Sequence, residues 1–199
     1  MTLRHLSHWV FDLDGTLTLA VHDFAAIRRH LGIPEQADIL HHLAELPATE
    51  REAKHAWLFE HERGLAVAAR PAPGAVALIR HLHEEGRPLG ILTRNARDLA
   101  LLTLAAIGLE DCFDPPAVLG RDEAARKPDP GGLLRLADLW QVAPARLVMV
   151  GDHRYDLECG RAVGCHTLQV NQPGDPWPAA RDQRFADCCE LLAALQNAG

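Results

Sequence analysis

The stretch His8-Trp-Val-Phe-Asp-Leu-Asp-Gly-Thr16 begins with a short apolar run and ends in two carboxylates and a glycine. The apolar residues predict a buried β-strand, because short continuous runs of this kind are typical of central strands in parallel sheets. Gly15 predicts a turn directly after the strand, since a residue without a Cβ can leave the β conformation freely. We therefore expect Asp12 and Asp14 at the carboxyl end of this strand.

Four more apolar runs follow along the chain, and stretches of helical length separate them. The runs are Pro88–Thr93, Ala117–Gly120, Arg146–Asp152 and His166–Val170. The helical stretches are Gly74–Glu85, Arg97–Ile107, Pro130–Trp140, Tyr155–Val163 and Ala186–Gln196. This alternation predicts an α/β fold, a doubly wound parallel sheet with helices on both faces.

Residues 21–70 interrupt the alternation, because they contain no strand-like run. Their pattern predicts three helices, His22–Leu31, Glu35–Leu46 and Thr49–Ala69, and Thr49-Glu-Arg-Glu52 is typical of a capping box at the start of the third. The proline-rich segment 69–74 predicts a stiff return. We expect an α/β core of residues 1–20 and 71–199, with a small helical cap of residues 21–70 inserted after the first strand.

The composition excludes several classes of protein. Of the 199 residues, 48% are hydrophobic and 24% are charged, which excludes an intrinsically disordered chain. The net charge of −7 argues against a protein that coats nucleic acid or anionic membranes. No apolar run approaches the roughly 18 residues of a membrane span. A small anionic substrate is not excluded, because net charge describes the whole surface and not the site.

Cysteine usage and the first residues predict a cytoplasmic protein. The five cysteines form an odd set without CxxC spacing, so neither a disulfide framework nor a zinc site is indicated. Met1–Val10 lacks the apolar run of a signal peptide.

Polar side chains stand at the carboxyl ends of the expected strands, where open α/β sheets bind their ligands. They are Asp12, Asp14, Thr93, Lys127, Asp152 and Asp156. If the strands are parallel, these side chains converge, and the clustered carboxylates raise one another's pKa. A hard divalent cation relieves that repulsion, and Mg²⁺ typically binds one or two carboxylates together with phosphate oxygens of a substrate.

Asp12-Leu-Asp-Gly-Thr16, Thr93, Lys127 and Gly151-Asp-His-Arg-Tyr-Asp156, in this order, resemble the four motifs of the haloacid dehalogenase superfamily of phosphohydrolases. The helical insert resembles that of the subgroup with a small α-helical cap, which includes phosphoglycolate-phosphatase-like enzymes. The resemblance covers the whole chain. It implies a Rossmann-like core and a Mg²⁺-dependent phosphatase of small phosphorylated metabolites, phosphoglycolate-like or sugar phosphates, working through an aspartyl-phosphate intermediate.

The resemblance also implies roles for the two aspartates of the first motif. Asp12 is the expected nucleophile. Asp14 is expected to protonate the leaving group and then to deprotonate the attacking water. The implied Mg²⁺ ligands are Asp12, the backbone carbonyl of Asp14, Asp152 and Asp156, the last either directly or through water.

The other matched residues are implied to bind the phosphoryl group. Thr93 and backbone N–H groups around Arg94 and Asn95 are expected to hold phosphate oxygens. Lys127 is expected to neutralise charge on the transferring group. The chain has only two lysines, Lys54 and Lys127, beside 18 arginines, which favours a specific need for a compact ammonium at position 127.

Other interpretations of single residues stay open. Asp12 and Asp14 also suit a solvated turn, Thr93 could cap the next helix, and Asp156 could cap the helix that it opens. Arg94, His153 and Arg154 could contact substrate or cap. The cap histidines fit a solvated helical surface, since no pair within one clear helix has the i, i+4 spacing of a metal site. They are His22, His30, His41, His42, His55 and His61.

Other functions also stay open. A phosphosugar mutase uses the same core, and a non-catalytic phosphate-binding module could be built on this fold. Dehalogenation is disfavoured, because dehalogenases of the family lack the second aspartate of the motif, here Asp14. Phosphonate hydrolysis needs a Schiff-base lysine in the cap, for which Lys54 is the only candidate.

Overall fold

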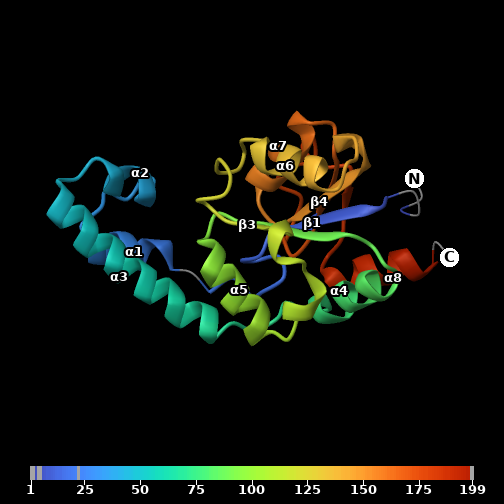
Figure 1. Ribbon diagram of the computed structural model, residues 1–199, viewed down its shortest axis with the longest axis horizontal. Helices are drawn as coiled ribbons and strands as arrows, with labels where there is room; N and C mark the ends of the chain where they lie inside the picture. Colours follow the sequence, from blue (N-terminus) through green and yellow to red (C-terminus); the bar gives the residue numbers. More distant parts are fainter. Residues whose placement is uncertain (1–2, 4–5, 22, 198–199) are drawn as a thin grey trace.

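The computed structural model describes residues 3, 6–21 and 23–197, and its centre is a six-stranded parallel sheet (Figure 1). The strands are β1 (His8–Phe11), β2 (Leu89–Leu92), β3 (Val118–Leu119), β4 (Leu147–Gly151), β5 (His166–Gln169) and β6 (Gln183–Arg184). Their order is β3-β2-β1-β4-β5-β6, and every neighbouring pair is parallel. The predicted doubly wound α/β fold is therefore confirmed. β6 was not predicted, because two polar residues at a sheet edge form no apolar run.

Helices cover both faces of the sheet, as Figure 1 shows. The helices of this part are α4 (Ala75–Glu84), α5 (Arg97–Ala106), α6 (Gly131–Leu139), α7 (Arg154–Ala162) and α8 (Cys188–Asn197). Trp9 and Phe11 of β1 pack on the face covered by α4, α5 and α8, whereas Val10 packs on the face covered by α6 and α7. Successive side chains of a strand point to opposite faces, so a strand buried on both faces must be apolar throughout.

Three helices between β1 and α4 form a separate lobe, at the left in Figure 1. They are α1 (Phe24–Leu31), α2 (Ile39–Ala44) and α3 (Ala48–Val67), and we call this lobe the helical insert. It has its own apolar cluster, which includes Ile27, Leu43 and Leu58. This separate cluster supports the proposed division into a core of residues 1–20 and 71–199 and a cap of residues 21–70. His22, the expected start of the first helix, lies outside the described residues.

The ends of the helices in the insert differ from prediction, and two of the differences have a clear local cause. The capping box at Thr49 was wrong: α3 begins at Ala48, Pro47 occupies the N-cap, and no side chain caps the helix. Proline fixes its φ angle near −65°, so Pro47 sets the start of the helix before Thr49. α2 is shorter than expected, because the side chain of Asp38 accepts the N–H of His41 and starts the helix there.

Short 3₁₀ turns lie in the connections between helices and strands. They are η2 (Glu110–Cys112), η3 (Pro115–Ala117) and η4 (Pro144–Arg146). None of the helices in the described ranges has the length and apolar character needed to cross a membrane.

Candidate active site

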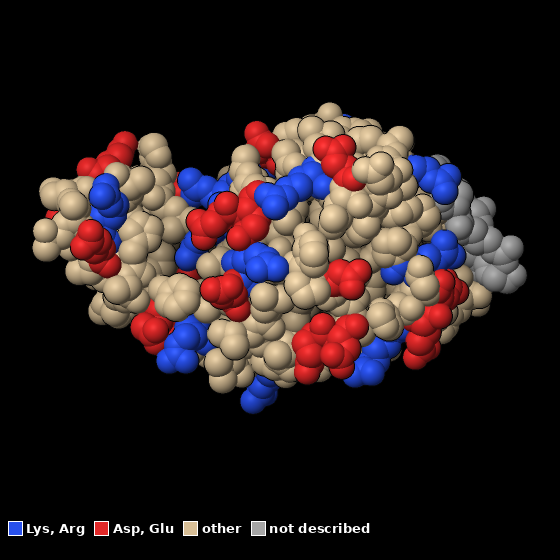
Figure 2. All heavy atoms as spheres, viewed as in Figure 1, with Lys and Arg blue, Asp and Glu red and all other residues tan. Residues whose placement is uncertain are grey.

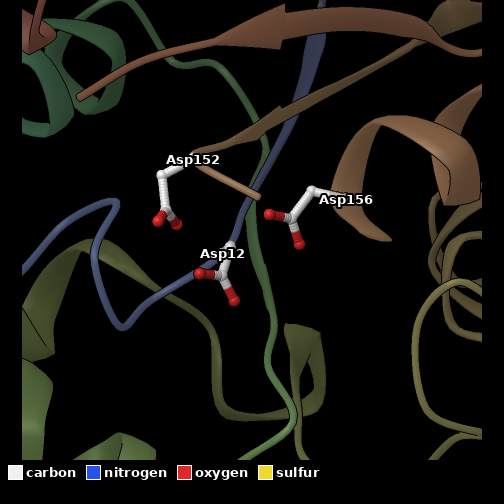
Figure 3. A group of neighbouring side chains, drawn as sticks. All are labelled: Asp12, Asp152 and Asp156. Atoms are coloured by element: carbon white, nitrogen blue, oxygen red, sulfur yellow. The ribbon is translucent and has the colours of Figure 1, made fainter. Parts of the chain in front are cut away.

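Three carboxylates converge at the carboxyl edge of the sheet, around β1 and its neighbour β4. Asp12 follows β1, Asp152 follows β4, and Asp156 lies in the first turn of α7. Each offers an oxygen within 4.8 Å of the others, and Figure 3 shows the carboxylates turned toward a common centre. The predicted convergence of these three residues is therefore present in the fold, because parallel strands end at the same edge.

Lys127 places its ammonium group between two of these carboxylates. Its Nζ atom lies 2.6 Å from Oδ1 of Asp12 and 2.7 Å from Oδ1 of Asp156. All three residues are buried, and Lys127 is 4% exposed. The structure thus brings the predicted lysine to the predicted nucleophile from a loop 115 residues away.

The group carries more negative than positive charge. Burial raises the pKa of Asp12 well above its usual value, and Lys127 opposes this effect while Asp156 and Asp152 add to it. Burial and the nearby Asp156 also raise the pKa of Asp152. Burial alone would lower the pKa of Lys127, but Asp12 and Asp156 outweigh burial and raise it. The site therefore holds three carboxyl groups and one ammonium, which contacts two of them, and this is an environment suited to an additional cation.

Residues outside the predicted set hold Asp152 in place. The hydroxyl of Thr16 donates to Oδ1 of Asp152 at 2.9 Å, and the amide of Gln172 donates to Oδ2 at 3.4 Å. Asn171 donates to the backbone carbonyls of Gly15 and Thr16 at 2.9 and 2.8 Å. Thr16 belongs to the motif Asp12–Thr16, so the sequence offered a signal that it lies at the site. Gln172 and Asn171 follow β5 and carry no such signal in the sequence.

The turn after β1 requires a glycine. Gly15 has a φ angle of +88°, and a Cβ at this position would lie 2.7 Å from Oδ2 of Asp152. An L-residue would therefore be strained in its backbone and would collide with the carboxylate. The expected turn at Gly15 is present, and it also makes room for Asp152.

Asp14 lies apart from the three carboxylates. It is partly exposed, and Oδ2 accepts a hydrogen bond from the side-chain amide of Asn95 at 3.5 Å. Thr93 is buried, and its Oγ1 accepts the N–H of Asn95 at 3.1 Å. Thr93 does not cap α5, because Ala96 occupies that N-cap. Asp14, Thr93 and Asn95 therefore form a second polar group beside the first.

Asp156 caps α7, which is one of the two roles that the sequence left open, and it also pairs with Lys127. Its Oδ2 accepts the backbone N–H of His153 at 3.0 Å, in a capping box at the start of α7, while Oδ1 binds Lys127. The side chain of Arg94 extends to the helical insert. Its guanidinium donates to Asp38 of the helical insert at 3.0 Å and lies 5.2 Å from the centre of the Tyr155 ring.

The donor chemistry of the carboxylate group fits a hard divalent cation. Asp12, Asp152 and Asp156 supply only oxygen ligands, and carboxylate oxygens are the ligands that Mg²⁺ prefers. The excess negative charge described above favours the same ion.

Comparison with known proteins extends this picture. Residues 7–164 match the haloacid dehalogenase-like hydrolase family. The chain is 29% identical to a phosphoglycolate phosphatase of Chromobacterium violaceum, with 99% of this chain and 100% of that protein covered. It is 32% identical to hexitol phosphatase A of Escherichia coli, with 84% of each covered. The structure of a hydrolase from Pseudomonas syringae superposes with a TM-score of 0.78 at 22% identity, covering 96% of this chain and 98% of that one. The chain belongs to the haloacid dehalogenase-like hydrolase family.

Proposed function

We propose that the protein is a Mg²⁺-dependent phosphatase that hydrolyses small phosphorylated metabolites through an aspartyl-phosphate on Asp12. The observation that carries this proposal is the position of Asp12: its buried carboxylate contacts Lys127 and lies beside Asp152 and Asp156. Membership of a hydrolase family and likeness to two phosphatases support the same reaction class. We also propose that it acts in the cytoplasm, on a small-molecule partner and not on nucleic acid.

The carboxylates of Asp12, Asp152 and Asp156, with the backbone carbonyl of Asp14, are the groups that would hold Mg²⁺. When bound, Mg²⁺ would neutralise negative charge at the site and polarise phosphoryl oxygens. This role agrees with the excess of carboxylates over ammonium groups in the site.

The chemistry proceeds in two displacements on phosphorus. A carboxylate oxygen of Asp12 forms a bond to phosphorus, the bond from phosphorus to the leaving oxygen breaks, and Asp14 acts as the general acid that gives that oxygen a proton. In the second step Asp14 accepts a proton from water. The water oxygen bonds to phosphorus and the bond from phosphorus to the Asp12 oxygen breaks, so inorganic phosphate leaves and the carboxylate of Asp12 is restored.

The remaining residues position the phosphoryl group. The hydroxyl of Thr93 already accepts the N–H of Asn95, so its own proton is free to donate to a phosphoryl oxygen. Lys127 orients the nucleophilic carboxylate and neutralises charge on the group in transfer. Asn95 positions Asp14 through its side-chain amide.

The test is phosphate release from a panel of small phosphate esters with Mg²⁺ and with EDTA. We expect turnover of at least one ester with Mg²⁺, and loss of turnover in Asp12→Asn with the fold retained. Asp111→Asn removes an exposed carboxylate in η2 and is the matched control. Near-normal turnover by Asp12→Asn would contradict the assigned nucleophile.

The same panel separates the alternatives. No turnover of any ester would favour a phosphate-binding module. Fast exchange of phosphosugar isomers with slow phosphate release would identify a mutase, because a mutase returns the phosphoryl group to the sugar.

A further inference from the structure

Two guanidinium groups from separate loops of the core meet on one carboxylate of the helical insert. Arg94 follows β2 and donates through Nη2 to Oδ2 of Asp38, and Arg126 follows β3 and donates through Nη1 to Oδ1, each at 3.0 Å. Asp38 is therefore held as a carboxylate bound to two arginines, with one oxygen on each. Figure 2 shows basic and acidic side chains close together where the lobe of the insert meets the rest of the molecule.

These two arginines are the chain neighbours of the residues that we assign to the phosphoryl group. Arg94 follows Thr93 directly, and Arg126 directly precedes Lys127. Because consecutive Cα atoms are about 3.8 Å apart, the backbones of both arginines lie beside the residues assigned to the phosphoryl group. Their side chains extend from there to the insert.

The contacts to Asp38 are of a kind that another anion can replace. The side chains of Asp38, Arg94 and Arg126 are 43%, 40% and 35% exposed. Ion pairs at such exposed positions are weak, because water and salt screen them and their side chains lose entropy. A carboxylate or phosphate on a bound substrate can therefore compete with Asp38 for the two guanidinium groups.

Loss of the Asp38 contacts does not detach the insert. Arg121 donates to both carboxylate oxygens of Glu62 on α3 at 3.2–3.3 Å, and these two side chains are only 14% and 13% exposed. α3 also packs on α5 through a buried cluster that contains Ala66 and Leu99. The end of the insert that carries Asp38 can thus release its arginines while α3 stays in place.

Arg94 has a further support that does not depend on Asp38. Its guanidinium lies 5.2 Å from the centre of the Tyr155 ring, within range of a cation–π contact. Arg154 lies 5.7 Å from the same ring and is paired with Glu158 at 3.4 Å. With one carboxylate shared between Arg94 and Arg126, these two residues keep one positive charge in excess.

We propose that Arg94 and Arg126 bind a second negatively charged group, a carboxylate or a phosphate, on the leaving group of the substrate, and that Asp38 competes with that group. This assignment rests on the proposed phosphatase function. It narrows the substrate class to phosphate monoesters with a second anionic group.

The test compares substrates that differ only in this second group. kcat/KM is measured with Mg²⁺ for phosphoglycolate, for 1,2-ethanediol bisphosphate and for 2-hydroxyethyl phosphate, whose leaving group is uncharged. The value for each ester with a charged leaving group is expressed as a ratio to the value for 2-hydroxyethyl phosphate. We expect wild-type ratios above one, with the larger of the two identifying a carboxylate or a phosphate as the preferred group. Arg126→Gln and Arg94→Gln should each lower that ratio by about tenfold or more.

Asp38→Asn should raise the ratio several-fold, because asparagine can still cap α2 but is neutral. Arg121→Gln is the matched control: it breaks another ion pair between insert and core, and we expect the ratio to stay unchanged. If both arginine variants release phosphate with unchanged kcat/KM ratios, the proposed anion site at Arg94 and Arg126 is wrong, and the phosphatase assignment stands. Absence of phosphate release from every ester would overturn both.

Discussion

The ammonium of Lys127 lies 2.6 Å from a carboxylate oxygen of Asp12, and both residues are buried. The same ammonium lies 2.7 Å from Asp156. Lys127 therefore links the carboxyl end of β1 to the start of α7 and offsets part of the negative charge at the site. Its removal should affect both stability and catalysis.

We expect Lys127→Met to abolish phosphate release and to lower the free energy of unfolding by about 3–5 kcal/mol, because it leaves buried carboxylates without a counter-charge. Urea unfolding at pH 7 measures the stability. Lys54→Met is the matched control, since Lys54 pairs with Glu50 on the surface of α3, and its loss should cost less than about 1 kcal/mol. Equal destabilisation by the two substitutions would contradict a special role for Lys127.

The raised pKa values of Asp12 and Asp152 predict how the stability of metal-free protein depends on pH. Burial and neighbouring carboxylates raise both values, so the folded state holds protons that the unfolded state has released above about pH 4. These two groups therefore lower the free energy of unfolding as pH rises from about 4 through their folded pKa values.

Urea unfolding in EDTA between pH 4.5 and 7.5 measures this dependence. Asp152→Asn should become more stable relative to wild type as pH rises, because one of the two groups is gone. Mg²⁺ should restore wild-type stability more at pH 7.5 than at pH 4.5. If the stability difference between Asp152→Asn and wild type did not change with pH, the pKa of the Asp152 carboxyl would not differ between the folded and unfolded states.

Two glycines should respond in opposite directions to replacement by alanine. Gly15→Ala should lower stability by about 1–3 kcal/mol and reduce turnover, because its φ angle is +88° and the new Cβ would meet Asp152. Gly64→Ala lies within α3 with no atom within 4 Å of the new Cβ, and it should raise stability by about 0.5–1 kcal/mol. Thermal unfolding of both variants measures the effects, and a stable, fully active Gly15→Ala would refute the steric argument.

Adjacent cysteines should differ in reactivity. Burial raises the pKa of the Cys188 thiol to about 12, and the same cause raises the pKa of Cys159 to about 12, whereas Cys189 is exposed. Because the thiolate is the reactive form, iodoacetamide at pH 8 should label Cys189 and spare Cys188 and Cys159 in the folded protein. Peptide mass spectrometry locates the label, and unfolding in guanidinium chloride should expose all five thiols. Equal labelling of Cys188 and Cys189 in folded protein would contradict this packing.

Sequence pattern was sufficient for the central strands and for the residues at their ends. β1, β2 and β4 are short apolar runs, and burial on both faces demands that pattern, so the runs mark these strands directly. The convergence of Asp12 with Asp152 follows from parallel strands ending at one edge. β6 has no such pattern, because it is an edge strand of two polar residues that pairs with β5 through its backbone.

Local pattern was not sufficient for helix ends and for supporting contacts. The start of α3 depends on Pro47, although Thr49 and Glu52 have the spacing of a capping box. Gln172 reaches Asp152 from the segment after β5, a contact across 20 residues that no local signal marks.

The sequence by itself determined which runs are buried strands and which carboxylates and lysine stand at the carboxyl edge, because burial and strand direction impose regular patterns on neighbouring residues. Only the tertiary structure decided that Arg94 and Arg126 share Asp38, a residue 56 and 88 positions away from them. The partner of an exposed charge depends on which surfaces the packed elements bring together. The identity of this partner leaves no periodic pattern in the sequence, because an exposed charged side chain is equally compatible with its own helix or loop whichever opposite charge it contacts.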